Sequence, residues 1–578
     1  MVRSQLQSRE RVTGYVQLGL AAFCLGWILF RLSRFSKADL LVLLPVAAFL
    51  GLAALHSKLI RRVTLCSRAI RFYEQGMARI DGSWAGQGIP GERFLEPSHP
   101  YARDLDLFGR ASIFELLCTA RTRAGEEALA GWLLAPASPD EVYNRQAAVG
   151  ELSGRLQFRE DLAKLGEDVA LGVRPTLLTA WGEAKAVFPS GMFRIVVPLL
   201  AGAWILSAIA WGLWGLPWSC VLALTLVNLV FSNRVGRRLN EATHAAEEAG
   251  NGLKLLSQVL AVFELEPFTS PRLLDLQAKL KREGVAPSQA IAKLSRMVES
   301  IESAHNLFVR MFDPVIFWRL QFVLAAERWR GRYGGLVGQW LGAVGELEAL
   351  ASLGGYTYEH PEDVFPEFIE ESPCFAAEGL AHPLVPRDRA VTNDLRLGPE
   401  LQLMIVSGPN MAGKSTFLRG IGVNAVLAQC GAPVRAARLK LSPLTVTASI
   451  CVLDSLEGGV SRFYAEIQRL KQIMDLTDGP APVLFLLDEL LSGTNSHDRL
   501  IGTRSFVTKL IERGAVGLVS THDLALTAIP GEIGSRAVNC HFEDHLETGQ
   551  LKFDYKLYPG VVQTSNALTL MRSIGLEV

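Results

Sequence analysis

The chain is short of charged residues. Of its 578 residues, 20% are Asp, Glu, Lys or Arg, whereas soluble globular domains carry about 25%. Lys plus Arg and Asp plus Glu both number 58, so the formal net charge is zero. This balance excludes a protein that is basic overall, as many nucleic-acid binders are, but leaves room for a local basic patch. Apolar segments outside an ordinary core are expected to account for the missing charge.

The cysteines lack a pattern. The chain has eight, and none stands in a Cys-x-x-Cys pair, which excludes a zinc ribbon or a dithiol redox motif. The hydrophobic fraction of 49% is too high for a chain that is disordered throughout. The length allows roughly three or four domains, and a core large enough to need no disulfide or structural metal.

Two uncharged apolar stretches lie near the N-terminus. Residues 12–30 carry no charge across 19 positions, and residues 40–55 are rich in Leu, Val and Ala. A helix needs about 20 apolar residues to cross a bilayer, so the pair predicts a transmembrane hairpin over residues 1–58. Three basic residues lie between the two stretches: Arg31, Arg34 and Lys37. Because these side chains favour the cytoplasmic side, a shallow re-entrant or interfacial hairpin stays open, as does a buried core helix for the second stretch.

The second apolar pair is longer. No charge occurs in the 39 positions between Arg194 and Arg234, and core helices rarely lack charge for so long. A Trp-Gly-Leu-Pro turn divides this window into helices over about residues 195–213 and 217–231. The flanking arginines favour the cytoplasmic side. The sequence therefore predicts a multi-pass protein of the cell (inner) membrane, with a second hairpin over residues 194–234 and a lipid bilayer as partner.

The rest of the chain changes once from a helical pattern to a mixed α/β pattern. Residues 59–193 are expected to form a linker and the first part of an all-α region, and residues 235–375 the rest of it, because both ranges contain apolar stripes at helical spacing. Residues 376–578 contain short β-rich runs between helical segments, which predict an α/β domain in the cytoplasm. The expected strands are 403–406, 483–487 and 516–519. The predicted fold class is thus multidomain, with two transmembrane helical hairpins, an all-α region and a C-terminal α/β domain.

A nucleotide-binding motif follows the first of these strands. Gly408, Gly413, Lys414 and Ser415 satisfy the pattern Gly-x4-Gly-Lys-Ser/Thr. In this pattern backbone N–H groups surround phosphate oxygens, the lysine reaches the β- and γ-phosphates, and the hydroxyl binds Mg²⁺. We therefore expect ATP and Mg²⁺ as ligands. The residues expected to contact the nucleotide here are Gly408, Pro409, Asn410, Met411, Ala412, Gly413, Lys414, Ser415 and Thr416.

The next two strands end in residues suited to hydrolysis. Residues 483–487 lead into Asp488 and Glu489; we expect Asp488 to hold Mg²⁺ through its water shell and Glu489 to polarise the attacking water. The third strand leads into His522, which can contact the γ-phosphate. An Asp-Glu pair is often only a solvated strand end, but its place after a phosphate loop favours catalysis. The predicted catalytic residues are Lys414, Glu489 and His522, and the predicted metal ligands are Ser415 and Asp488.

These motifs resemble the MutS family of mismatch-repair ATPases, within the ABC-type ATPase class. The phosphate loop is similar to the family's own, with Ala412 where glycine is usual. Ser461–Glu466 resembles the family's Ser-Thr-Phe-x-x-Glu signature, with arginine in place of threonine. His382-Pro383-Leu384 is similar to the segment that opens the family's ATPase domain, so His382 is expected at the nucleotide. The resemblance implies an ABC-type P-loop ATPase preceded by a MutS-like helical core and lever region.

The resemblance also implies a homodimer. In ABC-type ATPases the signature segment serves the nucleotide of the partner subunit, so Ser461 would donate a hydrogen bond to a γ-phosphate held by the other subunit's Lys414. Serine is also a good helix N-cap, and Ser461 stands directly before a predicted helix that begins at Arg462. The two roles are compatible.

The parts of the family that read mismatches are not matched. Mismatch-reading MutS proteins carry an N-terminal domain with a Phe-x-Glu wedge, where this chain has apolar stretches. DNA stays a possible partner that the residues do not support, since the basic cluster Lys279, Lys281 and Arg282 is more simply a solvated helix face. We expect a membrane-anchored MutS-like ATPase in which ATP drives dimer closure. The alternative is a mismatch-repair or recombination-related protein that acts on duplex or branched DNA through the helical core.

Overall fold

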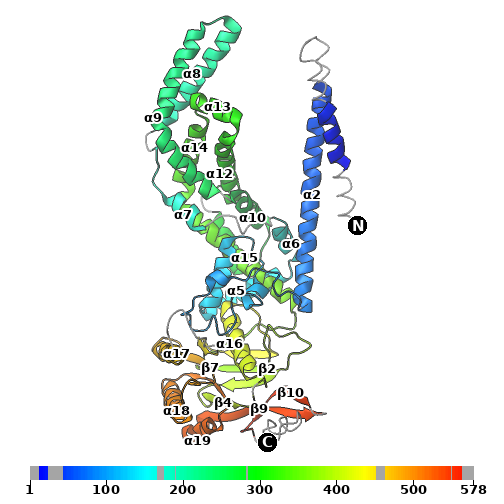
Figure 1. Cartoon of the computed structure of the whole chain (residues 1–578), viewed down its shortest axis with the longest axis vertical. Coiled ribbons are helices and arrows are strands. Elements are labelled where there is room, and N and C mark those ends of the chain that lie inside the picture. The colour runs from blue at the N-terminus through cyan, green and yellow to red at the C-terminus, as the bar shows by residue number, and fades with distance from the viewer. Residues whose placement is uncertain are drawn as a thin grey trace.

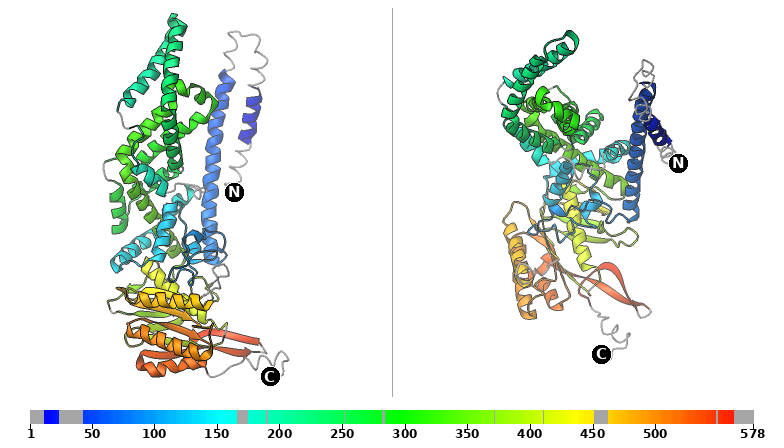
Figure 2. Two further views of the ribbon diagram at one scale, coloured as in Figure 1. Left: turned by 60° about the vertical axis from the view of Figure 1, so that its left-hand side comes forward. Right: turned by 45° about the horizontal axis from the view of Figure 1, so that its top comes forward.

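The protein is elongated, with an α/β domain at one end and apolar helices at the other (Figure 1). The structure is a computed structural model. It describes residues 12–23, 43–165, 175–188, 191–250, 252–281, 284–370, 372–409, 411–450, 462–547 and 550–562. A bundle of helices, here called the arm, connects the two ends, and Figure 2 shows the same arrangement from two further directions.

A six-stranded sheet forms the centre of the α/β domain. Its strand order is β10-β9-β4-β8-β7-β6, and every neighbouring pair is parallel except β9 and β10. The strands are β4 (Leu403–Ser407), β6 (Thr445–Ser449), β7 (Val483–Asp488), β8 (Val516–Thr521), β9 (Ala537–Glu547) and β10 (Gln550–Pro559). The three strands predicted from the sequence are confirmed as β4, β7 and β8.

A second, mixed sheet lies beside the first. Its order is β1-β5-β2-β3, and only β1 and β5 are parallel. The strands are β1 (Glu367–Phe368), β2 (Phe375–Leu380), β3 (Asn393–Leu397) and β5 (Arg438–Leu441). The ends of β2 and β3 reach the pocket described below.

The two faces of the six-stranded sheet enter different apolar cores. Side chains alternate along a strand, so Met404 and Leu486 face one way and Ile405 and Phe485 the other. The first set belongs to a core that contains α16 (Lys414–Cys430) and extends through the arm. The second set packs with residues of three helices in a smaller core. These helices are α17 (Arg462–Leu476), α18 (Ser496–Glu512) and α19 (Ile529–Ile533).

The axis of the arm is α15 (Val337–Glu359), which is buried over most of its length. Small residues let its neighbours approach closely: a Cβ added at Gly345 would lie 2.6 Å from the carbonyl oxygen of Ala124. The helices of the arm before α8 are α3 (Ile113–Leu117), α4 (Arg123–Leu134), α5 (Pro139–Ser153), α6 (Leu156–Lys164) and α7 (Pro175–Glu183). Those that follow α9 are α10 (Leu253–Leu265), α11 (Pro271–Leu280), α12 (Pro287–Glu302), α13 (Leu307–Ile316) and α14 (Trp318–Tyr333).

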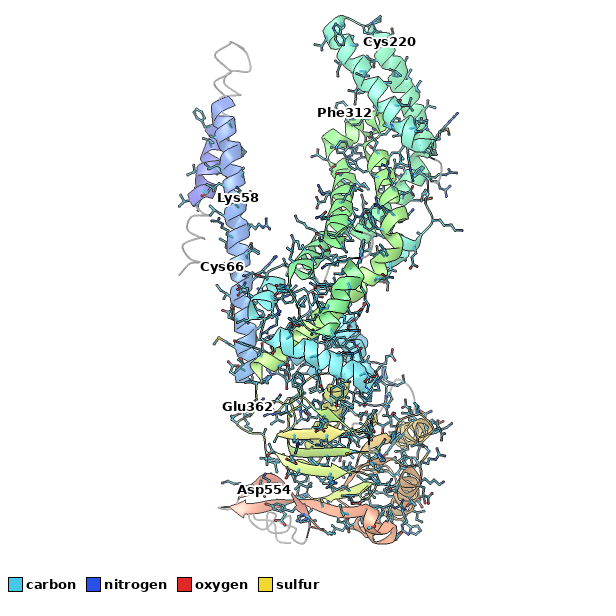
Figure 3. The ribbon with its side chains drawn as sticks, turned by 180° about the vertical axis from the view of Figure 1, so that it is seen from behind. Lys58, Cys66, Cys220, Phe312, Glu362 and Asp554 are labelled. Carbon is cyan, nitrogen blue, oxygen red and sulfur yellow. The ribbon has the colours of Figure 1, made fainter. Side chains whose placement is uncertain are left out.

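The second apolar pair forms a helical hairpin of α8 (Phe193–Trp214) and α9 (Trp218–Gly250). Figure 3 places Cys220 at its tip, at the end of the molecule opposite to Asp554 of β10. Both helices are long and apolar enough to cross a membrane, and only 11% and 6% of their apolar windows are buried, which excludes ordinary core helices. α9 continues past the predicted end at residue 231, because its later residues, such as Leu239 and Ala246, pack on the arm.

The first apolar pair is less complete. Val12–Phe23 is a short apolar helix, and it lies beside α2 (Leu43–Asp81), where Gly14 approaches the ring of His56. Among the described residues only α8 and α9 meet the length and apolarity of a membrane span, so two transmembrane hairpins are not clearly present. The predicted turn at residues 31–37 lies outside the described residues.

The predicted boundary at residue 58 falls inside α2, which is one unbroken helix. Its C-terminal half is clamped to the arm, because Arg79 donates two hydrogen bonds of 2.6 Å to the carboxylate of Glu359 at the end of α15. The hydroxyl of Tyr73 also donates to Glu160 of α6, at 2.6 Å. Apolar and amphipathic sequence therefore share one helix, and the composition change at residue 58 marks no break in the backbone.

A buried carboxylate joins α15 to the start of α4. Glu348 accepts hydrogen bonds from the backbone N–H groups of Arg121 and Thr122, at 3.1 and 3.0 Å, and from the hydroxyl of Thr122 at 2.5 Å. Burial raises the pKa of Glu348. Removal of this acceptor would leave buried donors unsatisfied.

We predict that Glu348→Ala lowers the melting temperature of the full chain strongly, since each buried donor left without a partner costs about 1–3 kcal/mol. Glu348→Gln should have a smaller effect because its side-chain oxygen still accepts. The matched control is Glu127→Ala, at an exposed position of α4. Thermal unfolding in detergent measures all three, and equal melting temperatures for Glu348→Ala and Glu127→Ala would contradict the prediction.

Candidate nucleotide site

The phosphate loop connects β4 to α16 and requires glycine at two positions. Gly408 has a φ of 148°, and a Cβ there would lie 2.8 Å from the carbonyl oxygen of Phe542. Gly413 has a φ of 97° and is the N-cap residue of α16. The N-terminus of α16 therefore faces the loop, where its free N–H groups and dipole favour an anion. Ala412 is buried, whereas Met411 is exposed, and Asn410 lies outside the described residues.

Lys414 is buried and closes the phosphate loop on itself. Its Nζ donates hydrogen bonds to the carbonyl oxygens of Gly408 and Pro409, at 2.8 and 2.9 Å. Burial lowers the pKa of the Lys414 amine, while Glu489 and Asp488 act in the opposite direction. A bound phosphate would compete with the two carbonyls for this amine.

The two predicted metal ligands are adjacent. The hydroxyl of Ser415, at the start of α16, donates to Oδ2 of Asp488, at the end of β7, over 2.5 Å. The hydroxyl of Ser520, on β8, donates to the other oxygen of Asp488. Hydroxyl and carboxylate oxygens are the hard ligands that Mg²⁺ prefers, usually together with phosphate oxygens and water. The pair suits a magnesium ion that arrives with a nucleotide.

Glu489 and His522 also meet, although they come from different strand ends. Oε1 of Glu489 lies 3.2 Å from Nδ1 of His522, and both side chains are partly exposed. Glu489 and Leu491 have φ values of 49° and 54°, a left-handed conformation that costs a non-glycine residue about 1–2 kcal/mol. Such strain persists only where neighbouring groups hold it.

Glu466 holds this strained turn. Its buried carboxylate, on α17, accepts a hydrogen bond of 2.5 Å from the backbone N–H of Leu491. The N–H of Glu489 donates to the carbonyl of Ser520 at 3.2 Å. Sequence reasoning named Glu466 as the last residue of the signature but gave it no role. Its contact with Leu491 could not be read from the sequence, because the two residues belong to separate elements.

A pocket of about 720 Å³ opens beside the phosphate loop, within the usual range of about 300–1,000 Å³ for small-molecule sites. Its lining includes Lys414 and Glu489, and also Arg389 and Tyr555, which sequence reasoning missed as site residues. Tyr555 belongs to β10 and lies against Gly413. The available signal was the run Phe553-Asp554-Tyr555-Lys556-Leu557, which is similar to the tail of MutS ATPase domains.

His382 lines the same pocket but carries no charge at neutral pH. Burial and, to a smaller extent, the neighbouring Arg419 and Arg435 together lower its pKa to about 4. Its Nδ1 accepts a hydrogen bond of 3.1 Å from the N–H of Leu384. His382 therefore shapes the wall of the pocket. The other predicted residue outside the phosphate loop, Ser461, lies outside the described residues.

Fold and motifs together are those of a nucleotide-binding domain. Comparison with known proteins identifies the family that this domain resembles. Residues 404–577 match the model of MutS domain V. This match relates the α/β domain of the chain to the MutS family.

Three curated relatives support this assignment. The chain is 30% identical over 242 residues to the DNA mismatch repair protein MutS of Geobacillus thermodenitrificans, covering 41% of this chain and 26% of the relative. It is 35% identical over 198 residues to DNA mismatch repair protein MutS 2 of Haloarcula marismortui, covering 33% and 20%. It is 31% identical over 238 residues to MutS of Natronomonas pharaonis, covering 40% and 27%. The chain thus matches about a quarter of the length of these relatives.

We predict that Lys414→Ala abolishes tight ATP binding, because the phosphates lose their buried cation. Glu489→Gln should still bind ATP but hydrolyse it about 10²–10⁴-fold more slowly, as expected on loss of a general base. Binding of a fluorescent ATP analogue and release of phosphate measure the two steps. Glu512→Gln, at the exposed end of α18, is the matched control. Equal turnover in Glu489→Gln and the control would remove Glu489 from the mechanism.

The lowered pKa of His382 predicts that the stability of the fold depends on pH. A histidine in the unfolded chain takes up a proton near pH 6.5, whereas folded His382 does so only near pH 4. The unfolded state binds the extra proton in this window, so stability falls as the pH drops from about 6.5 to 4, by up to about 3 kcal/mol. Melting temperatures at neutral pH and at about pH 5 should therefore differ more in the wild type than in His382→Gln. His497→Gln, an exposed position on α18, should behave like the wild type; if His382→Gln does too, the prediction fails.

Proposed function

We propose that the protein is a membrane-anchored MutS-like ATPase of the ABC type. One observation carries the proposal: a single chain has its phosphate-loop motif in the α/β domain at one end and an exposed apolar hairpin at the other (Figure 1). The arm connects them through helices that continue from one part to the next. ATP hydrolysis in the α/β domain would thus act on a structure attached to a bilayer.

In this proposal each group of the site has one task. Lys414 and the start of α16 bind the phosphates, and Ser415 and Asp488 hold Mg²⁺, which offsets phosphate charge when bound. Glu489 orients the attacking water, and its contact with His522 fixes the carboxylate. His522 would contact the γ-phosphate while it holds Glu489. The strained turn after β7 keeps Glu489 pointed into the pocket.

Exposed side chains support insertion of the hairpin into a membrane. Large apolar residues cover the outer faces of both helices: Ile195, Leu199, Leu206, Leu213, Leu222, Leu226 and Val230. Transfer of each from water into lipid would be favourable by about 1.5–3 kcal/mol. The exposed arginines at the base of the hairpin lie on its α/β-domain side: Arg194, Arg234, Arg237 and Arg238. The positive-inside rule then places the α/β domain in the cytoplasm.

A role on DNA is the second candidate, and the names of the relatives favour it. The relatives are DNA mismatch repair proteins, but the matches cover a minority of this chain. Of the basic cluster near residue 280, Lys279 pairs with Asp275 at 2.7 Å, and Arg282 lies outside the described residues. ATPase assays with and without duplex or branched DNA separate the candidates. Stimulation by DNA would favour the second, and full activity without DNA binding the first.

We predict that the protein fractionates with membranes and is released by detergent but not by high salt, because burial of apolar surface is not screened by ions. A chain that lacks residues 1–58 should stay bound through α8 and α9. This deletion spares the part of α2 that Arg79 clamps to α15. Recovery of the truncated chain in the soluble fraction would show that the hairpin is no anchor.

We predict a homodimer with two composite ATP sites, related by a two-fold axis. Lys414→Ala damages the site in its own subunit, and Ser461→Arg damages the site in the partner. Each variant should be nearly inactive alone, but a mixed dimer holds one site damaged twice and one intact site. Mixing should therefore restore part of the ATPase activity. Heterodimers that form but stay inactive would contradict independent composite sites.

A further inference from the structure

The short helix α13 presents apolar side chains to the outside of the arm. Leu307, Met311 and Phe312 are exposed by 80%, 63% and 41%. The opposite face is anchored, since Asp313 is buried and accepts a hydrogen bond of 2.6 Å from Nε of Arg319. Figure 3 places Phe312 at the upper end of the arm, beside the hairpin that carries Cys220. α13 is therefore amphipathic in the unusual sense that its apolar side faces away from the protein.

A buried asparagine fixes the level of α13 along the hairpin. Asn228 of α9 is fully buried, and its Nδ2 donates to the carbonyl oxygen of Val315 in α13 at 2.8 Å. The same nitrogen lies 3.5 Å from the carbonyl oxygen of Leu200 in α8. Asn228 precedes Arg234 by six residues, and Leu200 follows Arg194 by six. At 1.5 Å per residue, both counts place the end of α13 about 9 Å beyond the arginines, toward the tip.

At this level the base of the hairpin is covered by protein on one side. Val197 and Ala201 of α8 are buried, and α8 and α9 both contact α13 and α14. The ring of Phe231 packs edge-on against Phe317, directly after α13, with centroids 5.4 Å apart. Part of the uncharged window thus has a protein neighbour, and α13 belongs to that neighbour.

Exposed apolar side chains also occur on the hairpin next to the residues that meet α13. Leu199 and Val227, next in sequence to Leu200 and Asn228, are exposed by 65% and 52%. On α13, the exposed Met311 and Phe312 lie about one helical turn before Val315, the residue that Asn228 contacts. A bilayer whose surface lies at the arginines would reach all of them, and about 9 Å agrees with the roughly 5–10 Å at which interfacial amphipathic helices lie.

We infer that α13 is an interfacial membrane helix whose partner is the phospholipid of the cytoplasmic leaflet. Leu307, Met311 and Phe312 insert at the boundary between headgroups and acyl chains, and the exposed Arg310 reaches headgroup phosphate. The inference rests on the proposed insertion of the α8–α9 hairpin and extends it to the arm. With α13 in the leaflet, the arm has a second contact with the bilayer and cannot rotate freely about the hairpin.

Photo-crosslinking to lipid tests the inference. The full chain is reconstituted in nanodiscs of equal parts phosphatidylcholine and phosphatidylglycerol, with photoreactive benzoylphenylalanine in place of Met311. Two matched variants carry the same group in place of Leu226, exposed on α9, or Tyr358, exposed on α15 near the α/β domain. After irradiation, mass spectrometry counts peptides that carry a phospholipid. All three positions are exposed, so the variants should fold alike, which retained ATP binding verifies.

The expected result is a phospholipid yield at positions 226 and 311 that is several-fold above that at 358. A high yield at 226 with a background yield at 311 would overturn the inference and leave the membrane anchor intact. Background yields at both 226 and 311 would overturn the anchor and the inference together. The two failures are therefore distinguishable.

Discussion

The packing of α16 between the sheet and the arm is the constraint on which the rest of the structure depends. A Cβ added at Gly422 would lie 2.6 Å from Leu105, in the turns that lead into α3 of the arm, and 2.7 Å from Leu486 of β7. The helix that begins at the phosphate loop therefore has no free space on either side. Since interiors are packed as densely as crystals, a displacement of α16 must displace the arm as well.

Polar contacts reinforce this packing at both ends of α16. Near its start, Nε of Arg419 donates to the carbonyl oxygen of Asp104 at 3.0 Å, and its guanidinium lies 3.2 Å from the carboxylate of Asp106. At its end, the guanidinium of Arg145 donates to the carbonyl oxygen of Cys430 at 3.3 Å. The helical region is thus fitted to the nucleotide domain along the whole helix. In the proposed function this contact transmits nucleotide binding to the arm.

The sequence predicted those parts of the molecule whose determinants are local. Central parallel strands are buried on both faces and read as apolar runs, which is why β4, β7 and β8 were found. The phosphate loop is a continuous motif, and α8 and α9 are long enough to be recognised by composition. Tyr555 and Glu466 were not assigned to the site, because distant segments bring them to it. His382 is neutral because of burial and because Arg419 and Arg435 lie nearby. The position of α13 along the hairpin depends on one hydrogen bond of Asn228. Neither feature can be recognised from neighbouring residues in the sequence.

Two continuous helices decide how the apolar end and the α/β end of the molecule can move relative to each other. α9 runs from the apolar hairpin into the arm, and α2 runs from the first apolar pair to the junction with the α/β domain. α2 is clamped there by Arg79 and Glu359, near the position of Glu362 in Figure 3. Because neither helix is broken, the arm cannot tilt against α2 unless the ion pair opens or α2 tilts with it. Separation of this largely buried ion pair would leave each charge without its partner, which is costly. Tilting of α2 together with the arm is therefore the easier motion. In the proposed function, closure of two nucleotide domains would then change the angle at which α2 and the α8–α9 hairpin meet the bilayer.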